Sequence, residues 1–255
     1  MKPRVMIIRA AGTNCDVETQ YAFELAGAQA ERVYIDEVKQ RNLTQYQIIA
    51  LPGGFTYGDD IAAGKILANE IKYKIREQFL RFIEKENLII GICNGFQVLV
   101  KSGILPSFDE YFEDQTVSVI ANDSDRFEDR WVYMKVHGER SVFTKGMADI
   151  ITLPVAHAEG KFVARDESVL HEIQQRVVFQ YVDEKGASAG YPYNPNGSTK
   201  NIAGIADKTG RVLGLMPHPE RFFSYIQHPK HTRENIPEQG DGFHIFKNAV
   251  DFFKS

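Results

Sequence analysis

Cysteine and tryptophan are scarce in this 255-residue sequence, which has two cysteines and one tryptophan. Two cysteines cannot build the disulfide framework of a small secreted domain, so a reducing compartment is expected, where a cysteine is either catalytic or inert. The sequence also lacks any stretch of about 18 apolar residues, the length that a membrane span requires. Its apolar start is too short for a signal peptide. We therefore expect a cytoplasmic protein without a membrane segment.

Positive charge is not in excess either, because 30 Lys and Arg residues face 34 Asp and Glu residues, a net charge of −4. A general nucleic-acid-binding protein would show a basic face, so nucleic acid is not expected as a partner. Nucleotide-binding loops are missing: five residues separate Gly58 from Gly64 where a P-loop has four, and no G-x-G-x-x-G occurs. No cofactor is expected in this chain. The cysteines lack metal-site spacing, and a solvated loop is preferred over a zinc site for His228, His231 and His244.

The first hundred residues instead show strands alternating with helices. Strands are predicted at 5–8, 32–35, 47–51 and 88–92, and helices at 16–26, 61–85 (in one or two pieces) and 94–101. This spacing predicts parallel strands with crossover helices. The second half is richer in strands, at 116–121, 131–136, 150–155, 177–181, 202–206 and 212–216, before a last helix at 242–253; loops are expected at 186–200 and 227–240. We expect one domain, residues 1–255, of α/β class: an open, mixed, mostly parallel sheet with helices on both faces.

The segment around Cys93 has the pattern of a nucleophile. An apolar strand ends at Cys93 and a helix begins at once, with Gly91 and Gly95 on either side, as in the G-x-nucleophile-x-G elbow. A helix N-terminus carries partial positive charge, which favours the thiolate. The alternative interpretation is an inert cysteine that ends a core strand. Cys15 has no such glycine pair and no obvious base, so it is predicted to be non-catalytic.

A candidate base and its orienting group stand near the C-terminus, where His218 and Glu220 are two residues apart. Pro217 and Pro219 disfavour a helix for the residue before each of them, so the segment is expected to be extended. Residues i and i+2 of an extended chain point to the same side, about 6.5 Å apart. Glu220 could then bond one imidazole nitrogen while the other faces the cysteine, as a Cys–His pair requires. The alternative is an exposed proline-rich turn.

A double glycine, Gly53 and Gly54, follows the predicted strand 47–51. Ligands of open α/β sheets bind beyond the carboxyl ends of the strands, so this loop and the Cys93 turn are expected to meet. The backbone N–H of Gly54 or Phe55 would be one oxyanion donor and that of Asn94 another. A turn that needs glycine only for its geometry is the alternative.

Two of these patterns together resemble the class I, or triad, glutamine amidotransferases. They are Gly91-Ile92-Cys93-Asn94-Gly95-Phe96-Gln97 and Pro217-His218-Pro219-Glu220, and the resemblance covers essentially the whole chain. It implies the family's fold, with flavodoxin-like layering. It also implies that Cys93 attacks the carboxamide of glutamine, that His218 transfers protons and that Glu220 holds His218. Ammonia leaves, and water resolves a glutamyl thioester.

Finer features resemble one branch of that family, the glutaminases that serve purine biosynthesis. Asn-Gly-Phe follows the cysteine where other branches usually carry Leu-Gly, and residues 14–16, 52–59 and 154–160 agree with the branch, except that Ala158 replaces a frequent glycine. By this resemblance Gln97 contacts glutamine, and Gly53 and His157 are further candidates for the glutamine pocket.

The same resemblance implies partners. Because the chain has no ATP motif, its ammonia would pass to a separate synthetase subunit, which binds ATP and Mg and makes formylglycinamidine ribonucleotide, with a small accessory subunit beside it. The Gly53-Gly54 loop is expected to act as a gate, because glycine permits a peptide flip. One lost oxyanion donor costs about 10²–10³-fold in rate, so weak hydrolysis is expected without the partner.

Other functions stay open on the sequence alone. The chain could be the glutaminase subunit of a different amidotransferase, which co-purification with its partner would reveal. It could be a cysteine peptidase or chaperone with a related sheet, although such proteins lack the His-Pro-Glu pattern at the chain end. It could also be a non-enzymatic module that has kept the fold, against which the complete triad argues.

Overall fold

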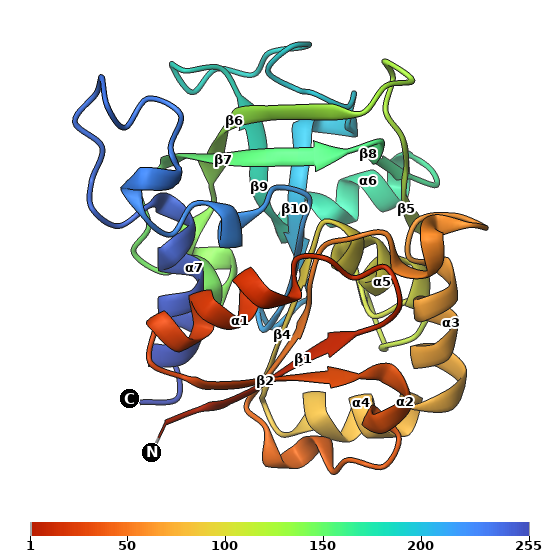
Figure 1. The fold of residues 1–255 in the computed structure, drawn as a ribbon. Helices are drawn as coiled ribbons and strands as arrows, with labels where there is room; N and C mark the ends of the chain where they lie inside the picture. Colours follow the sequence, from red (N-terminus) through yellow and green to blue (C-terminus); the bar gives the residue numbers. More distant parts are fainter. Residues whose placement is uncertain (1, 255) are drawn as a thin grey trace.

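A nine-stranded sheet forms the centre of the computed structural model, which describes residues 2–254 (Figure 1). Its strands lie in the order β2-β1-β3-β4-β11-β10-β9-β6-β7. Their bounds are β1 (Arg4–Arg9), β2 (Gln29–Tyr34), β3 (Ile48–Leu51), β4 (Leu88–Ile92), β6 (Glu128–Val136), β7 (Ile150–His157), β9 (Val177–Val182), β10 (Ile202–Ala206) and β11 (Val212–Leu215). Two further strands, β5 (Val117–Ala121) and β8 (Glu159–Ala164), form a separate antiparallel pair.

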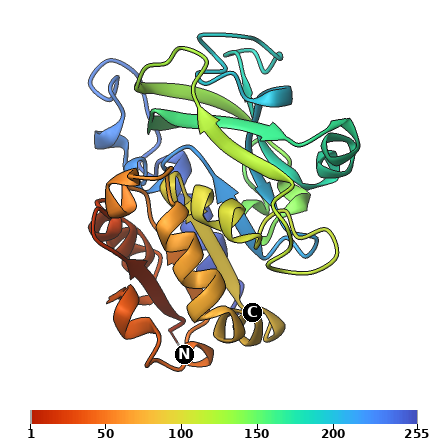
Figure 2. The same cartoon turned by 90° about the vertical axis from the view of Figure 1, so that its right-hand side faces the viewer.

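The strand directions confirm a mixed, mostly parallel sheet. Strands β2, β1, β3, β4 and β11 pair in parallel, whereas β11-β10-β9-β6-β7 pair antiparallel. Those five strands and β9 and β7 run in one direction, so only β10 and β6 of the nine strands in this sheet are reversed. Figure 2 shows β1 to β4 with the helices between them (red to yellow) below the antiparallel strands β6, β7 and β9 (green to cyan). Strands β3, β4, β10 and β11 are buried throughout, which is why they are almost wholly apolar.

Helices cover both faces of this sheet, as predicted. Helix α1 packs against α7, and α3 packs against α5 (Figure 1). The helices of the described chain are α1 (Asp16–Leu25), α2 (Ile35–Val38), α3 (Lys65–Lys74), α4 (Arg76–Glu84), α5 (Asn94–Ser102), α6 (Glu167–Ile173) and α7 (Asp241–Asp251). Helix α1 ends before Gly27, whose φ of +99° suits the residue that follows a helix. No helix within residues 2–254 is long and apolar enough to cross a membrane.

Several element boundaries differ from the sequence prediction. The predicted helix 61–85 starts later and forms two helices, α3 and α4, which a non-helical Ile75 separates. Strand β8 and helix α6 were not predicted at all. Helix α6 did carry a signal, because the Asp166 side chain caps it by accepting a hydrogen bond from the Val169 N–H. Strand β5, predicted as 116–121, pairs with β8 outside the main sheet, and pairing partners are not visible in a local pattern.

The sheet brings three loops together. Strand β4 pairs in parallel with β3 on one side and with β11 on the other, so the carboxyl ends of the three strands share one edge. The double glycine follows β3, Cys93 follows β4, and the His218 segment follows β11. This is the edge where open α/β sheets bind their ligands.

Candidate functional site

The turn at Cys93 has the strained geometry of a nucleophile elbow. Its φ and ψ angles are 51° and −105°, a left-handed region that non-glycine residues rarely occupy. A Cβ added to Gly95 would lie 1.8 Å from the Leu51 carbonyl oxygen, and one added to Gly91 would lie 2.6 Å from the Gly95 carbonyl oxygen. Both glycines are therefore needed because α5 crosses β3 and β4 at backbone contact. The Asn94 N–H, in the first turn of α5, has no intrahelical acceptor.

His218 and Glu220 form the buried pair that their spacing predicts. The His218 backbone is extended, with φ −104° and ψ 91°, and its N–H donates to the Pro154 carbonyl oxygen at 2.8 Å. Its Nδ1 lies 2.6 Å from Glu220 Oε1, and both side chains are almost fully buried. His218 Nε2 has no hydrogen-bond partner within residues 2–254, which leaves it for the reacting groups.

The charges around His218 favour an imidazolium. Burial alone would lower its pKa, but the Glu220 carboxylate and the neighbouring Cys93 raise the pKa of His218 well above its ordinary value. The structure thus brings Cys93, His218 and Glu220 together in the order that a nucleophile, a base and its orienting group require.

Cys15 lies closer to this group than the sequence suggested. Its sulfur is 4.0 Å from His218 Nδ1, so the expectation of no nearby base is wrong. The nitrogen concerned, however, is the one bonded to Glu220. Burial raises the pKa of the Cys15 thiol, and Glu220 adds to this effect although His218 and Arg221 oppose it. Cys15 does not line the cavity described below, so its environment keeps the thiol protonated and away from a ligand.

The loop that follows β3 is fixed by backbone hydrogen bonds to residues 11–15. The Phe55 N–H donates to the Gly12 carbonyl oxygen at 2.9 Å, so it is not available as the oxyanion donor that was predicted. No hydrogen bond within the described chain uses the Gly54 N–H, which leaves Gly54 as the candidate donor of this loop. Gly53 lies against the His218 ring and is not among the residues that line the cavity, in contrast to its prediction as a pocket residue.

A cavity of about 210 Å³ opens at Cys93. It is bounded by the loop after β3, the start of α5 and the turn between β7 and β8. The lining residues are Gly54, Phe55, Asp59, Ala63, Cys93, Gln97, Ala156, His157, Ala158 and Glu159. Gln97 and His157, both predicted as pocket residues, therefore border the cavity.

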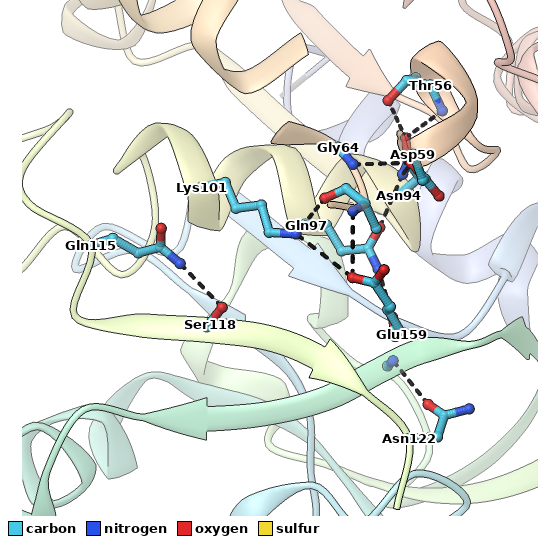
Figure 3. Close-up of polar contacts among 12 residues, drawn as sticks. Thr56, Asp59, Gly64, Asn94, Gln97, Lys101, Gln115, Ser118, Asn122 and Glu159 are labelled. Carbon is cyan, nitrogen blue, oxygen red and sulfur yellow. Dashed lines mark hydrogen bonds and ion pairs between the residues drawn. The ribbon is translucent and has the colours of Figure 1, made fainter. Parts of the chain in front are cut away.

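His157 is held as a neutral, structural side chain. Its Nδ1 lies 3.1 Å from Asn122 Oδ1, and its Nε2 lies 3.4 Å from Asn196 Nδ2. Burial, with a smaller contribution from His218, lowers the pKa of His157 to about 3. Asn122 Oδ1 also accepts the Gly160 N–H at 2.9 Å (Figure 3). His157 and Asn122 thus fix the turn between β7 and β8.

Asn94 organises a polar network beside the cavity that the sequence analysis missed (Figure 3). Its Oδ1 accepts a hydrogen bond from the Thr56 hydroxyl at 2.7 Å. Its Nδ2 donates to Asp59 Oδ1 at 3.1 Å and to Gln97 Oε1 at 3.0 Å. Gln97 Nε2 in turn donates to the Glu159 carbonyl oxygen at 2.5 Å. The network ties the elbow helix to both neighbouring loops.

Two acidic residues of this network, Asp59 and Glu159, were not recognised as site residues. Both lie in segments that the sequence analysis singled out, 52–59 and 154–160. The available signal was position: Asp59 belongs to the loop after a predicted buried strand, and Glu159 is two residues beyond His157. Neither position shows by itself that the two carboxylates border one cavity.

One group within residues 2–254 offers three possible metal ligands close together, namely Cys15, His218 and Glu220, whose ligand atoms lie within 4.8 Å of one another. The Arg221 guanidinium already donates to the Cys15 sulfur at 3.3 Å, and its charge disfavours a cation there. His218 and Glu220 also bond each other directly. The arrangement therefore suits proton transfer rather than metal binding. His228 packs against Trp131 and Phe222 instead of joining a metal site.

Known proteins are similar in sequence to this chain over nearly their full length. A family described as the CobB/CobQ-like glutamine amidotransferase domain matches residues 2–253. The chain is 49% identical over 253 residues to phosphoribosylformylglycinamidine synthase subunit PurQ of Dehalococcoides mccartyi, with 98% of this chain and 97% of that protein covered. It is 43% identical over 271 residues to the same subunit of Methanococcus maripaludis, with 99% of each covered.

Solved structures agree with these sequence matches. A chain in the structure of PurLQS from Thermotoga maritima matches with a TM-score of 0.77 and 31% identity, covering 99% of this chain and 100% of that one. A glutamine amidotransferase from the same organism matches with a TM-score of 0.52 and 19% identity over 89% of this chain and 79% of that one. The second match supports the fold alone.

Proposed function

This chain belongs to the family of CobB/CobQ-like glutamine amidotransferase domains, and from that premise we propose that it is the glutaminase subunit of a phosphoribosylformylglycinamidine synthase. It hydrolyses glutamine to glutamate and ammonia. A separate synthetase subunit uses the ammonia and ATP to make formylglycinamidine ribonucleotide in purine biosynthesis. The observation that carries the proposal is the buried pair of Glu220 and His218 next to Cys93, which lines a cavity. The PurQ relatives support this branch of the family.

The chemistry follows from the charges at the triad. The Cys93 thiolate attacks the carboxamide carbon of glutamine, and a C–S bond forms while the carbonyl oxygen becomes an oxyanion. The His218 imidazolium gives its Nε2 proton to the nitrogen, the C–N bond breaks, and ammonia leaves. Water then attacks the thioester, and His218 accepts its proton while the C–S bond breaks to give glutamate. Glu220 holds the ring through Nδ1 in both steps and stabilises its charged form.

The oxyanion is stabilised by the N–H groups of Gly54 and Asn94. Both residues adjoin Cys93 in the fold, and neither N–H has another acceptor in the described chain. Donors fixed in place before the reaction need no reorganisation when the charge develops. The clamp between Phe55 and Gly12 holds the loop. A partner that shifts this loop would change the oxyanion geometry, which makes the loop a point of control.

The partners follow from the proposed reaction. The synthetase subunit, with a small accessory subunit beside it, provides ATP, Mg and the acceptor site, and this chain needs no cofactor of its own. The PurLQS structure supports this set of partners, since a chain in it matches nearly the whole of the present one. The reaction belongs to the cytoplasm, where the substrates of purine biosynthesis are.

The test is steady-state glutamate release by the purified chain and by the complex reconstituted with its synthetase and accessory subunits. We expect weak release by the chain alone and strong stimulation by the complex, greater when ATP and the ribonucleotide substrate are bound. Cys93→Ala in the same complex is the control for contaminating glutaminases. Full activity of the isolated chain, unchanged when the partners are added, would contradict the proposed regulation by the partner. Absence of Cys93-dependent glutamate release in every mixture would contradict the glutaminase function.

A further inference from the structure

Carboxylate side chains outside the triad give the cavity beside Cys93 a negative charge. Of the ten residues that line it, the only two with carboxylate side chains are Asp59 and Glu159, and no lysine or arginine is among them. A buried cation, Lys101, which is 8% exposed, lies next to these residues, and its Nζ donates to the Ala63 carbonyl oxygen at 2.6 Å. It is 3.9 Å from Glu159 Oε2 (Figure 3). The carboxylates of Asp59 and Glu159 together with the ammonium of Lys101 therefore carry one net negative charge.

Each carboxylate is anchored through one oxygen only. Asp59 Oδ1 accepts the Gly64 N–H at 3.2 Å and the Asn94 amide at 3.1 Å, as Figure 3 shows. Glu159 Oε2 accepts the Ala63 N–H at 3.4 Å. Asp59 Oδ2 and Glu159 Oε1 have no hydrogen-bond donor within residues 2–254. Each residue therefore keeps one free acceptor oxygen at the cavity, which suits a ligand that carries several N–H donors.

Both residues are held rigidly. Tyr57, Gly58 and Asp59 have φ values of 55°, 70° and 54°, three consecutive left-handed residues, and strain of this kind concentrates at functional sites. The Tyr57 hydroxyl, bonded to Glu70, fixes the same loop from outside. Glu159 is held through its own carbonyl oxygen by the Gln97 amide. The loop that carries Asp59 and the main chain of Glu159 are therefore both fixed beside the cavity.

The separation of Cys93 and Gln97, which both line the cavity, fits a glutamine that is attached at Cys93. Gln97 lies one turn of α5 beyond Cys93, a rise of about 5.4 Å. The Glu159 main chain is bonded to the end of the Gln97 side chain. An extended glutamine spans roughly 5 Å from its carboxamide carbon to its α-nitrogen, with C–C bonds of about 1.5 Å. When the carboxamide is at Cys93, the α-ammonium group therefore reaches the depth of Gln97 and Glu159.

We propose that Asp59 and Glu159 bind the α-ammonium group of glutamine and so make the cavity selective for the amino acid over a simple carboxamide. This inference rests on the proposed glutaminase function and adds the residues that recognise the substrate. The ammonium group supplies the N–H donors for the two carboxylate oxygens that have none, and its positive charge balances their negative charge. Burial raises the pKa of Asp59, and Glu159 adds to that rise. A cation bound between the carboxylates relieves this repulsion.

The experiment measures the second-order rate constant for alkylation of Cys93 by two diazo-ketones. One is the diazo-ketone analogue of L-glutamine, and the other is the same compound without the α-amino group. Intact mass and peptide mapping of the full chain, alone and with its partner subunits, identify the labelled cysteine. The variants are Asp59→Asn, Glu159→Gln and the double variant. Glu77→Gln, which changes an exposed carboxylate on α4, is the matched control.

The native chain and the control should react at least 10-fold faster with the amino-bearing compound. Loss of one charge-assisted hydrogen bond corresponds to about a 10- to 100-fold effect. Each single variant should lose that factor for the amino-bearing compound, and the rate with the other compound should stay within about 3-fold. Equal losses for both compounds, or no preference in the native chain, overturn the inference and leave the glutaminase function intact. If neither compound labels Cys93, both the inference and the proposed glutaminase function are overturned.

Discussion

The substitution Gly95→Ala tests whether the elbow depends on backbone contact between α5 and β3. The added Cβ would lie 1.8 Å from the Leu51 carbonyl oxygen and 2.6 Å from the Leu51 carbonyl carbon. An ordinary contact needs at least 3.4 Å, and β3 is buried over its whole length. The obstacle is backbone rather than a flexible side chain, so the helix or the strand must move.

The expected cost follows from two opposing effects. Overpacking a core costs about 1–3 kcal/mol, and a backbone obstacle places this site at the upper end. Alanine gains about 1 kcal/mol over glycine in helix propensity. The net loss in unfolding free energy is then about 2 kcal/mol. In a protein of this size 1 kcal/mol changes Tm by about 2–4 °C, so Tm should fall by about 4–8 °C.

Activity should fall more steeply than stability. A helix shift of about 1 Å moves Cys93 and the Asn94 N–H together, and such a misplacement can cost 10²-fold in rate. Thermal unfolding and Cys93 alkylation by the diazo-ketone analogue of glutamine measure the two effects on the same preparation. Gly190→Ala is the control, because a Cβ at Gly190 meets nothing within 4 Å and its φ is not left-handed. A Gly95→Ala variant with native Tm and native alkylation rate would refute the reasoning.

Three further predictions concern the site. Cys93→Ala should abolish labelling by the glutamine analogue, whereas Cys15→Ala should leave it in place; intact mass decides, and label on Cys15 in the Cys93→Ala variant would exclude the assignment. His218→Ala should lower glutamate release by at least 10²-fold, since general acid–base catalysis contributes about 10²–10⁴-fold, and Glu220→Gln should lose less because a hydrogen bond to the ring remains; negligible losses in both would show that the triad is wrongly assigned. His157, with a pKa of about 3 when folded and about 6.5 when unfolded, stays neutral in the fold while the unfolded chain takes up a proton. Stability should therefore fall as pH is lowered from about 6.5 to about 3, and urea unfolding of His157→Gln should show a flatter pH dependence over that range.

The sequence alone predicted the class of fold and the three residues, Cys93, His218 and Glu220, that the structure places together. Buried parallel strands are apolar on both faces, so β3, β4 and β11 were visible as continuous apolar runs. Cys93 directly follows β4, and His218 and Glu220 lie in the segment that follows β11, so these positions can be read from the local sequence. The extended geometry of His218 and Glu220 followed from the two prolines that flank His218.

Only the tertiary structure decided the rest of the site. Asp59 and Glu159 are 100 positions apart, and they border one cavity because the β7–β8 turn lies over the start of α5. A hydrogen bond from the Phe55 N–H to the Gly12 carbonyl oxygen leaves Gly54 as the candidate oxyanion donor of its loop. The environment of Cys15 depends on a contact with His218, which is 203 residues away. Local sequence patterns indicate which faces of a strand or helix are buried and where the chain turns. Which side chains meet across loops depends on strand pairing, and pairing is set by the packing of the whole sheet.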